Sequence, residues 1–247
     1  MDFQDYVKFL DWSLKPFYQT ENAVGGHDWL HVRDVERMGP KIRSYLEFDM
    51  NEFTIAAKLH NIDRSKKMKP VCDSRGGEET LLRRLLINAP FSSDARDRIV
   101  FAVLQHGEKS LREDAPSLAV ALQDADKLVR FRPSNLLAEG AYGGYAGIPA
   151  FLPKNPFGFT STREEGRLSM WLGFMGNLEW IGMLSCDAAR ELIDPGYLAY
   201  FMSYLRLLGR EMAEYAGCLS RAEDDIRKAL GSYCNWVEKR IRGRAIS

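Results

Sequence analysis

The sequence predicts an all-α protein. Apolar residues recur at three- and four-residue intervals through most of the 247 residues, which is typical of helices that bury one face. Stretches with the strict alternation of a half-buried strand are scarce. Glycine, proline and short polar residues separate the apolar stretches and mark helix ends. We therefore expect a helical bundle.

The first two helices are separated by a glycine pair. An apolar stripe predicts the first helix at residues 3–17. The break follows at Gly25 and Gly26, since glycine weakens a helix and favours a turn. His27 or Asp28 is then expected to open the second helix.

The third helix is expected to end at a polar doublet. It begins near Asn51, which we take as its N-cap, and ends at His60 and Asn61. In a later helix, Asp126 lies beside an apolar face, where an unpaired carboxylate would be costly to bury. These later helices are expected at residues 81–86, 94–105 and 116–131.

A long glycine- and proline-rich stretch interrupts the helical pattern at residues 141–162, where we expect an irregular loop. Its aromatic residues can form a lid over a pocket or stack on a nucleobase, or pack down as a structural flap. Helical patterns resume beyond it, at 163–184 and then in two long C-terminal helices. The starts of the two long helices are indicated by Asp194 before Pro195 and by a Ser220–Glu223 capping box.

Composition argues against several classes of partner. The 34 basic and 34 acidic residues cancel, so broad attraction to nucleic acid or to an anionic membrane is not expected. The N-terminal residues are acidic where a secretory signal is basic, and no apolar stretch approaches the roughly 20 residues that span a bilayer. The four cysteines are widely spaced. We expect a cytoplasmic protein.

Four polar residues stand out as candidate metal ligands. His31 shares a helical stripe with apolar residues, and a lone histidine there is more often a hydrogen-bonded core residue than a ligand. His60 with Asn61 at a helix end, and Asp126 on a later helix, make the metal hypothesis stronger. Two histidines with oxygen ligands suit Mn, Fe, Co, Ni or Zn and leave positions open for water and substrate.

The order of these motifs resembles the HD-domain superfamily of metal-dependent phosphohydrolases. The strings are GHDWLHVRDV, KLHNIDRSKK and ALQDADKLVRF, and the resemblance covers about residues 20–135. It implies an HD-like bundle in a single domain over residues 1–247, with additional C-terminal helices at 163–247. It also implies one divalent ion (Mn, Fe, Co, Ni, Zn or Mg) held by four residues, which are His31, His60, Asn61 and Asp126.

The sequence departs from the family pattern at Asn61, where the family has an aspartate. An amide offers one neutral oxygen and cannot bridge two metals as a carboxylate does, so we expect weaker metal binding. Two-metal members carry a further histidine where this chain offers only Glu78 and Glu79. A one-metal site is therefore expected.

Further residues near the motifs are candidates for substrate binding and proton transfer. Arg64 is the expected phosphate contact, with Lys66 and Arg33 nearby. Asp63 and His106 are candidate proton carriers. His106 can equally be an exposed residue at a helix end, and His27 is expected to support the site without binding the ion.

Three functional readings follow. The resemblance implies hydrolysis of a nucleotide or another small phosphoester by a metal-activated water. Asn61 motivates the alternative of a degenerate HD domain that binds a nucleotide or a partner protein without catalysis. A third reading takes His27 and His31 as a variant of the H-E-x-x-H zinc-protease helix, which leaves His60 and Asp126 unexplained. The C-terminal helices offer a possible homodimer surface.

Overall fold

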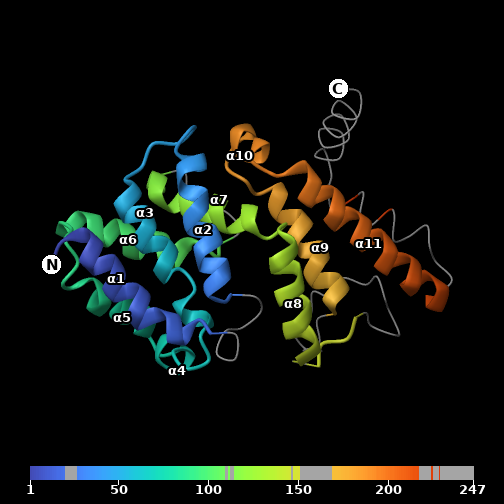
Figure 1. Cartoon of the computed structure of the whole chain (residues 1–247), viewed down its shortest axis with the longest axis horizontal. Coiled ribbons are helices and arrows are strands. Elements are labelled where there is room, and N and C mark those ends of the chain that lie inside the picture. The colour runs from blue at the N-terminus through green and yellow to red at the C-terminus, as the bar shows by residue number, and fades with distance from the viewer. Residues whose placement is uncertain are drawn as a thin grey trace. The chain divides into compact units, whose positions relative to one another are not determined.

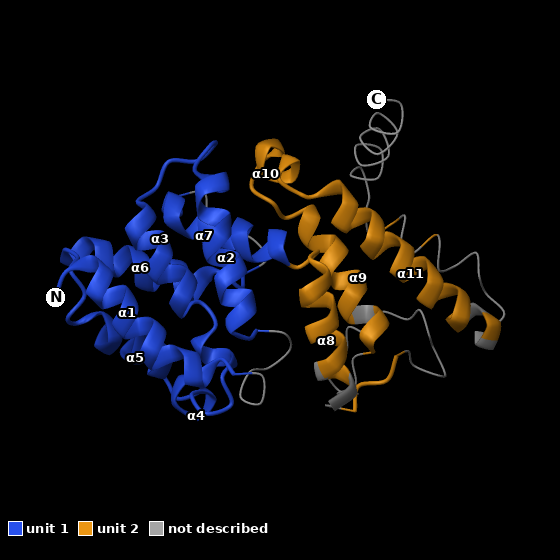
Figure 2. Cartoon of the chain, in the orientation of Figure 1, with its two compact units in different colours: residues 1–129 blue, residues 130–247 orange. Residues whose placement is uncertain are grey.

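The computed structural model describes residues 1–19, 27–108, 111, 114–145, 147–150, 169–216, 224 and 228. Every regular element in these residues is a helix, and they contain no strand (Figure 1). The all-α prediction is confirmed. The chain divides into two compact units, residues 1–129 and 130–247, which we describe separately (Figure 2). A single HD-like domain over residues 1–247 stays a prediction.

Unit 1 contains the helices that carry the candidate ligands. Four of them, α2, α3, α6 and α7, pack against one another, while α1 packs on α3 and α5 on α6. In chain order the elements are α1 (Phe3–Leu14), η1 (Lys15–Phe17), α2 (Trp29–Ile42), α3 (Met50–Leu59), η2 (Ile62–Arg64), α4 (Lys69–Cys72), α5 (Gly77–Leu86), α6 (Ser93–Gln105) and α7 (Ser117–Val129), where η marks a 3-10 helix.

The starts of α2 and α3 are fixed by aspartate caps. The Asp28 carboxylate accepts a hydrogen bond from the backbone N–H of His31 at 3.0 Å, so the predicted start of α2 at this position is confirmed. The predicted cap of α3, Asn51, is wrong. Asp49 caps α3 instead, and its carboxylate accepts from the backbone N–H of Asn51 at 2.7 Å. The predicted end of α3 at His60 is confirmed, since Leu59 is its last residue.

Unit 2 contains α8 (Pro133–Tyr145), α9 (Met170–Ile181), α10 (Asp187–Glu191) and α11 (Pro195–Ala216). Asp194 caps α11 as predicted, because its carboxylate accepts from the backbone N–H of Gly196 at 2.8 Å. The predicted capping box and the second C-terminal helix lie outside the described residues, apart from positions 224 and 228. Among the described helices, none combines the length and apolar character needed to cross a bilayer.

The predicted irregular loop begins later than expected. Residues 141–145 belong to α8, so that part of the prediction is wrong. Gly143 has a packing reason to be glycine within the helix, since a Cβ there would lie 2.1 Å from the sulfur of Met170. The rest of the loop from residue 151, with Phe151 and Phe157, lies outside the described residues.

A buried lysine ties α3 to two neighbouring helices. The Lys58 side chain is 1% exposed, and its Nζ lies 2.6 Å from Oδ1 of Asp11 in α1 and 3.2 Å from Oε2 of Glu36 in α2. The same ammonium lies 5.6 Å from the centre of the Trp29 ring, a distance suited to a cation–π contact. Two carboxylates and one aromatic ring therefore compensate the cost of burying this charge.

Replacing Lys58 with alanine should lower the free energy of unfolding by about 3 kcal/mol, because Asp11 and Glu36 would lose their shared counter-charge in a partly buried site. Urea denaturation followed by circular dichroism measures the change. Lys8→Ala is the matched control: Lys8 pairs with Asp5 on the surface at 3.6 Å, and its loss should cost less than about 0.5 kcal/mol. Equal losses in the two variants would contradict this account of α3.

Candidate metal centre

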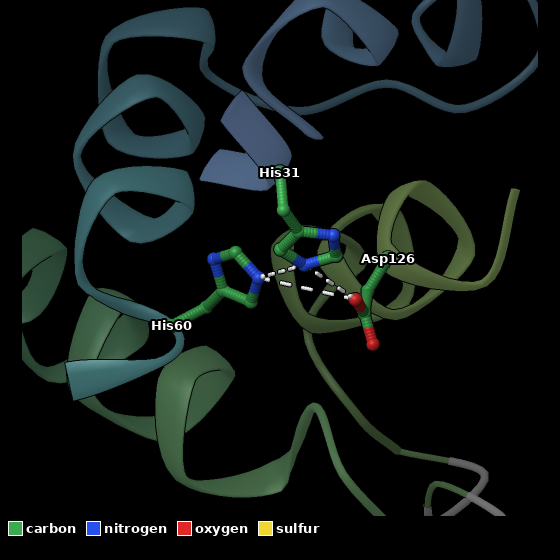
Figure 3. Close-up of side chains that lie close together, drawn as sticks. All are labelled: His31, His60 and Asp126. Carbon is green, nitrogen blue, oxygen red and sulfur yellow. Dashed lines mark hydrogen bonds and ion pairs between the residues drawn. The ribbon is translucent and has the colours of Figure 1, made fainter. Parts of the chain in front are cut away.

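Three helices of unit 1 bring the side chains of His31, His60 and Asp126 together (Figure 3). His31 lies in the first turn of α2, His60 directly follows α3 as its C-cap, and Asp126 lies on the buried face of α7. Both histidine side chains are fully buried, and Asp126 is buried as well. Residues separated by as many as 95 positions therefore share one water-poor site.

The potential ligand atoms of these residues converge closely. The Nε2 atoms of His31 and His60 lie 3.1 Å apart. Oδ1 of Asp126 lies 3.1 Å from Nε2 of His31 and 3.9 Å from Nε2 of His60. For comparison, two ligand atoms at about 2.1 Å from one ion and at right angles to each other lie roughly 3.0 Å apart. The spacing of the three atoms is therefore compatible with one shared divalent ion.

The orientation of His60 is set by the backbone of its own helix. Nδ1 of His60 lies 2.7 Å from the carbonyl oxygen of Ala57, to which it can donate its proton. Burial holds the pKa of His60 well below its usual value, and the nearby His106 and His31 lower it further. A neutral ring that is protonated on Nδ1 presents the lone pair of Nε2 to the cluster, as metal binding requires.

Asn61 is also buried at the cluster, and its side-chain amide is in contact with His60. Nδ2 of Asn61 lies 2.6 Å from Nε2 of His60, so the amide can donate to the lone pair that an ion would use. Rotation of the amide by half a turn exchanges its nitrogen and oxygen. The Asn61 oxygen is therefore within reach of the cluster only after this hydrogen bond is given up.

His106 and His27 flank the three potential ligands. The His106 ring lies 5.2 Å from that of His60, and its Nδ1 lies 2.6 Å from the carbonyl oxygen of Val103. Burial lowers the pKa of His106. The His27 ring lies 5.4 Å from that of His31, which agrees with a supporting position.

The sequence analysis did not predict that backbone carbonyls orient His60 and His106. Each histidine caps a helix and contacts the carbonyl oxygen three residues before it, that of Ala57 or Val103. The shared signal is a histidine directly after the last turn of an apolar helix, where carbonyl groups lack helical partners.

The other predicted site residues contact neighbouring side chains or solvent. Asp63 follows the His60–Asn61 doublet, and its Oδ2 lies 3.2 Å from Nε of Arg64, whose side chain is about half exposed. Lys66 is exposed. Arg33 is two residues from His31, which places the two about 200° apart around α2, and its Nε lies 3.6 Å from Glu36. The structure does not bring Arg33 to the cluster, so its role in substrate binding stays a prediction.

Comparison with known proteins identifies the fold. No protein-family model matches the sequence, and no curated protein matches it. Solved structures do match. An HD-superfamily hydrolase from Bacillus thuringiensis has a TM-score of 0.55 and 16% identity, over 87% of this chain and 96% of that one. This chain has the HD-domain fold.

Two further structures share this HD-domain fold. A protein from Lactobacillus plantarum gives a TM-score of 0.66 at 16% identity, over 87% of this chain and 97% of the other. Bacillus subtilis YpgQ, crystallised in complex with ADP, gives 0.59 at 18% identity, over 87% of this chain and all of the other. The fold predicted from the motifs is confirmed, while the metal ligands stay a prediction with which the geometry above is compatible.

Loss of one potential ligand should weaken metal binding strongly. His31→Ala, His60→Ala and Asp126→Ala should each weaken Mn²⁺ or Co²⁺ binding by more than about 100-fold, because loss of even an outer partner of a ligand costs about 10- to 100-fold. Isothermal titration calorimetry on the refolded apo-protein measures this. His27→Ala is the matched control: at a supporting position it should weaken binding by no more than about 10- to 100-fold, which is less than the loss of a ligand. Loss of metal in His27→Ala but not in His60→Ala would instead favour the zinc-protease hypothesis.

Glu78, whose carboxylate is close enough to Asp63 to feel its charge, makes the free energy of unfolding depend on pH. Burial and the nearby charge of Asp63 raise the pKa of Glu78 to about 7, against the opposing effect of Arg64. Since the folded state then binds this proton more tightly than the unfolded chain, stability falls as pH rises from about 4.5 through 7.

Glu78→Gln should therefore stabilise the metal-free protein by about 1–2 kcal/mol at pH 8 and leave its stability at pH 4 unchanged. Urea titrations at the two pH values, in the presence of EDTA, measure the difference. Glu79→Gln, which removes the neighbouring exposed carboxylate, controls for loss of surface charge. A stabilisation by Glu78→Gln that is the same at pH 4 and pH 8 would contradict the assignment.

Proposed function

We propose that this protein is a metal-dependent phosphohydrolase that acts on a nucleotide or another small phosphoester. The observation that carries the proposal is the convergence of the His31, His60 and Asp126 ligand atoms within 4.8 Å of one another. The HD-domain fold supports it, since a structure of this fold is described as a hydrolase and another holds ADP.

His31, His60 and Asp126 would hold the divalent ion, with Asn61 as a weaker fourth ligand. The ion would lower the pKa of a bound water and polarise a phosphoryl oxygen. Three protein ligands leave positions for water and substrate, as in other catalytic metal sites. Of the ions considered, Mn, Fe, Co, Ni and Zn suit two imidazoles better than Mg does.

Arg64 and Lys66 would offset the charge of the phosphate. They lie three and five residues after Asn61 and are exposed, so their side chains can turn towards a bound anion. Asp63 would accept a proton from the attacking water, because its Oδ1 is buried without a hydrogen-bond partner among the described residues. The proton that Asp63 accepts would pass to the leaving group, and His106, whose Nδ1 can donate to the Val103 carbonyl, would offer Nε2 as a further proton acceptor.

The 2.6 Å contact between Asn61 and His60 favours a second candidate function, a nucleotide-binding HD domain without turnover. An amide that occupies the lone pair of His60 competes with the ion, and it adds no negative charge. In this alternative Arg64 and Lys66 bind the phosphate, and no metal ion is retained.

The two functions are separated by assays of wild type beside Asn61→Asp. Both proteins are loaded with Mn²⁺, Co²⁺, Ni²⁺, Zn²⁺ or Mg²⁺, and phosphate release is measured with nucleotides and phosphomonoesters. We expect turnover by wild type, and metal binding by Asn61→Asp that is tighter by about tenfold or more, because a carboxylate adds charge to the ligand set. Asp126→Asn should remove activity, while Asp97→Asn, an exposed carboxylate of α6, should leave it unchanged.

The hydrolase proposal fails if wild type neither retains metal nor cleaves any substrate while Asn61→Asp does both. In that case ADP binding by wild type, measured by calorimetry with no metal added, would establish the binding function. Absence of both ADP binding and turnover would contradict both candidate functions.

A further inference from the structure

Tyr18 contacts the ends of the two helices that position His31 and His60. It directly follows η1, and its side chain is buried. Its backbone carbonyl accepts a hydrogen bond from the N–H of Trp29 at 2.9 Å, and its ring lies 6.0 Å from the Trp29 ring. Trp29 is the first residue of α2, two positions before His31. Tyr18 is therefore joined to the first turn of α2.

The hydroxyl group of Tyr18 contacts the backbone on both sides of His60. It donates a hydrogen bond at 3.0 Å to the carbonyl oxygen of Lys58, in the last turn of α3. The same phenolic oxygen accepts a hydrogen bond from the backbone N–H of Asn61, which directly follows His60. Carbonyl groups in the last turn of a helix lack helical donors, so the hydroxyl satisfies one of them. One side chain thus links the end of α3 to the turn that follows it.

Burial keeps the Tyr18 hydroxyl in its protonated form. Burial and the charge of Asp63 raise the pKa of Tyr18, while the hydrogen bond from Asn61 has a smaller and opposite effect. The neutral phenol therefore donates to Lys58 and accepts from Asn61 at the same time. A buried backbone group that loses its partner pays the cost of leaving water. Removal of the hydroxyl should therefore free the turn after α3 to open or shift.

The turn after α3 needs such support because the contacts of the His60 ring do not fix it. The Ala57 carbonyl orients that ring relative to α3. The helix itself ends at Leu59, and the next helix, η2, begins only at Ile62. Asn61 lies in the turn between them, so the place of its side chain depends on how its backbone is held. The hydrogen bond from its N–H to Tyr18 supplies that support.

We propose that Tyr18 is a positioning residue of the metal centre, whose hydroxyl group holds the His60–Asn61 turn against the first turn of α2 and so sets the affinity for a divalent ion. The proposal rests on the proposed function, since it requires that His31, His60 and Asp126 bind the ion. Without the hydroxyl the three ligands remain, but α2 and the end of α3 are less firmly joined. Metal affinity then falls while the fold persists.

Tyr18→Phe tests the proposal in the full-length chain, because it removes the hydroxyl and keeps the ring. Isothermal titration calorimetry on the apo-protein should show Mn²⁺ or Co²⁺ binding that is weaker by about tenfold, the lower end of the range for groups that support a ligand. Tyr6→Phe is the matched control. Tyr6 is also buried, and its hydroxyl donates at 2.7 Å to the carbonyl oxygen of Leu85 in α5, a helix that carries none of the candidate ligands.

The two variants separate a positioning role from a purely structural one. Each loses a buried hydrogen bond from tyrosine to a backbone carbonyl, so the urea midpoints should fall by similar amounts. Tyr6→Phe should nevertheless change metal affinity by less than about twofold, because distant sites without shared partners are nearly independent. Amide hydrogen exchange in EDTA adds a readout that needs no metal: Tyr18→Phe should speed exchange at Asn61 at least about tenfold more than at Ile55 within α3, and Tyr6→Phe should not.

A loss of affinity confined to Tyr18→Phe, with faster exchange at Asn61, supports the proposal. Equal metal affinities in Tyr18→Phe and Tyr6→Phe would overturn it and leave the proposed function intact, whereas absence of metal binding by wild type would overturn both. If Tyr18→Phe does not fold, exchange in wild type decides. Protection of the Asn61 amide equal to that of Ile55 then supports the proposal, and exchange as fast as that of an exposed amide overturns it.

Discussion

The burial of imidazole and carboxylate groups at the junction of α2, α3 and α7 is the constraint on which unit 1 depends. A polar group in a helical core costs several kcal/mol unless it finds a partner. The Ala57 carbonyl satisfies Nδ1 of His60, but the lone pair on Nε2 faces both His31 and the Asp126 carboxylate. A proton donor such as the Asn61 amide, or a cation, can satisfy acceptors that converge in this way, so the packing of three helices creates a potential binding site.

Helix α3 must be held firmly for this convergence to persist, because it ends at His60. The ion pairs of two buried side chains, Lys58 and Glu52, hold it from different sides. Lys58 joins α3 to α1 and α2, and Glu52 joins it to α6, where its Oε2 accepts a hydrogen bond from Arg98 at 3.0 Å. Helices α2 and α3 also approach closely, since a Cβ on Gly39 of α2 would lie 2.7 Å from the ring of Phe53 in α3. The ion pairs that hold α3 thus also fix the position of the His60–Asn61 doublet.

Periodicity predicted the helices and the place of the potential ligands, because a buried face repeats at 3.6 residues whatever the tertiary contacts. It could not choose Asp49 over Asn51 as the cap of α3, since either short polar side chain can cap a helix. The glycines and prolines from residue 141 onwards predicted a loop, although Gly143 lies in α8, where Met170 packs against it. Distances between His31, His60 and Asp126 depend on contacts far apart in sequence, which local patterns do not contain.

Asn61 shows how one side chain can shift the balance between the metal-free and metal-bound states. A carboxylate at this position would add a second negative charge near buried Asp126, and without an ion the two would repel each other in a site of low dielectric constant. The amide of Asn61 instead donates to Nε2 of His60 and relieves an unsatisfied acceptor. The metal-free core is stabilised as a result, while an ion must displace that hydrogen bond and gains less charge in return. An amide at position 61 is therefore expected to favour the metal-free state over the metal-bound state.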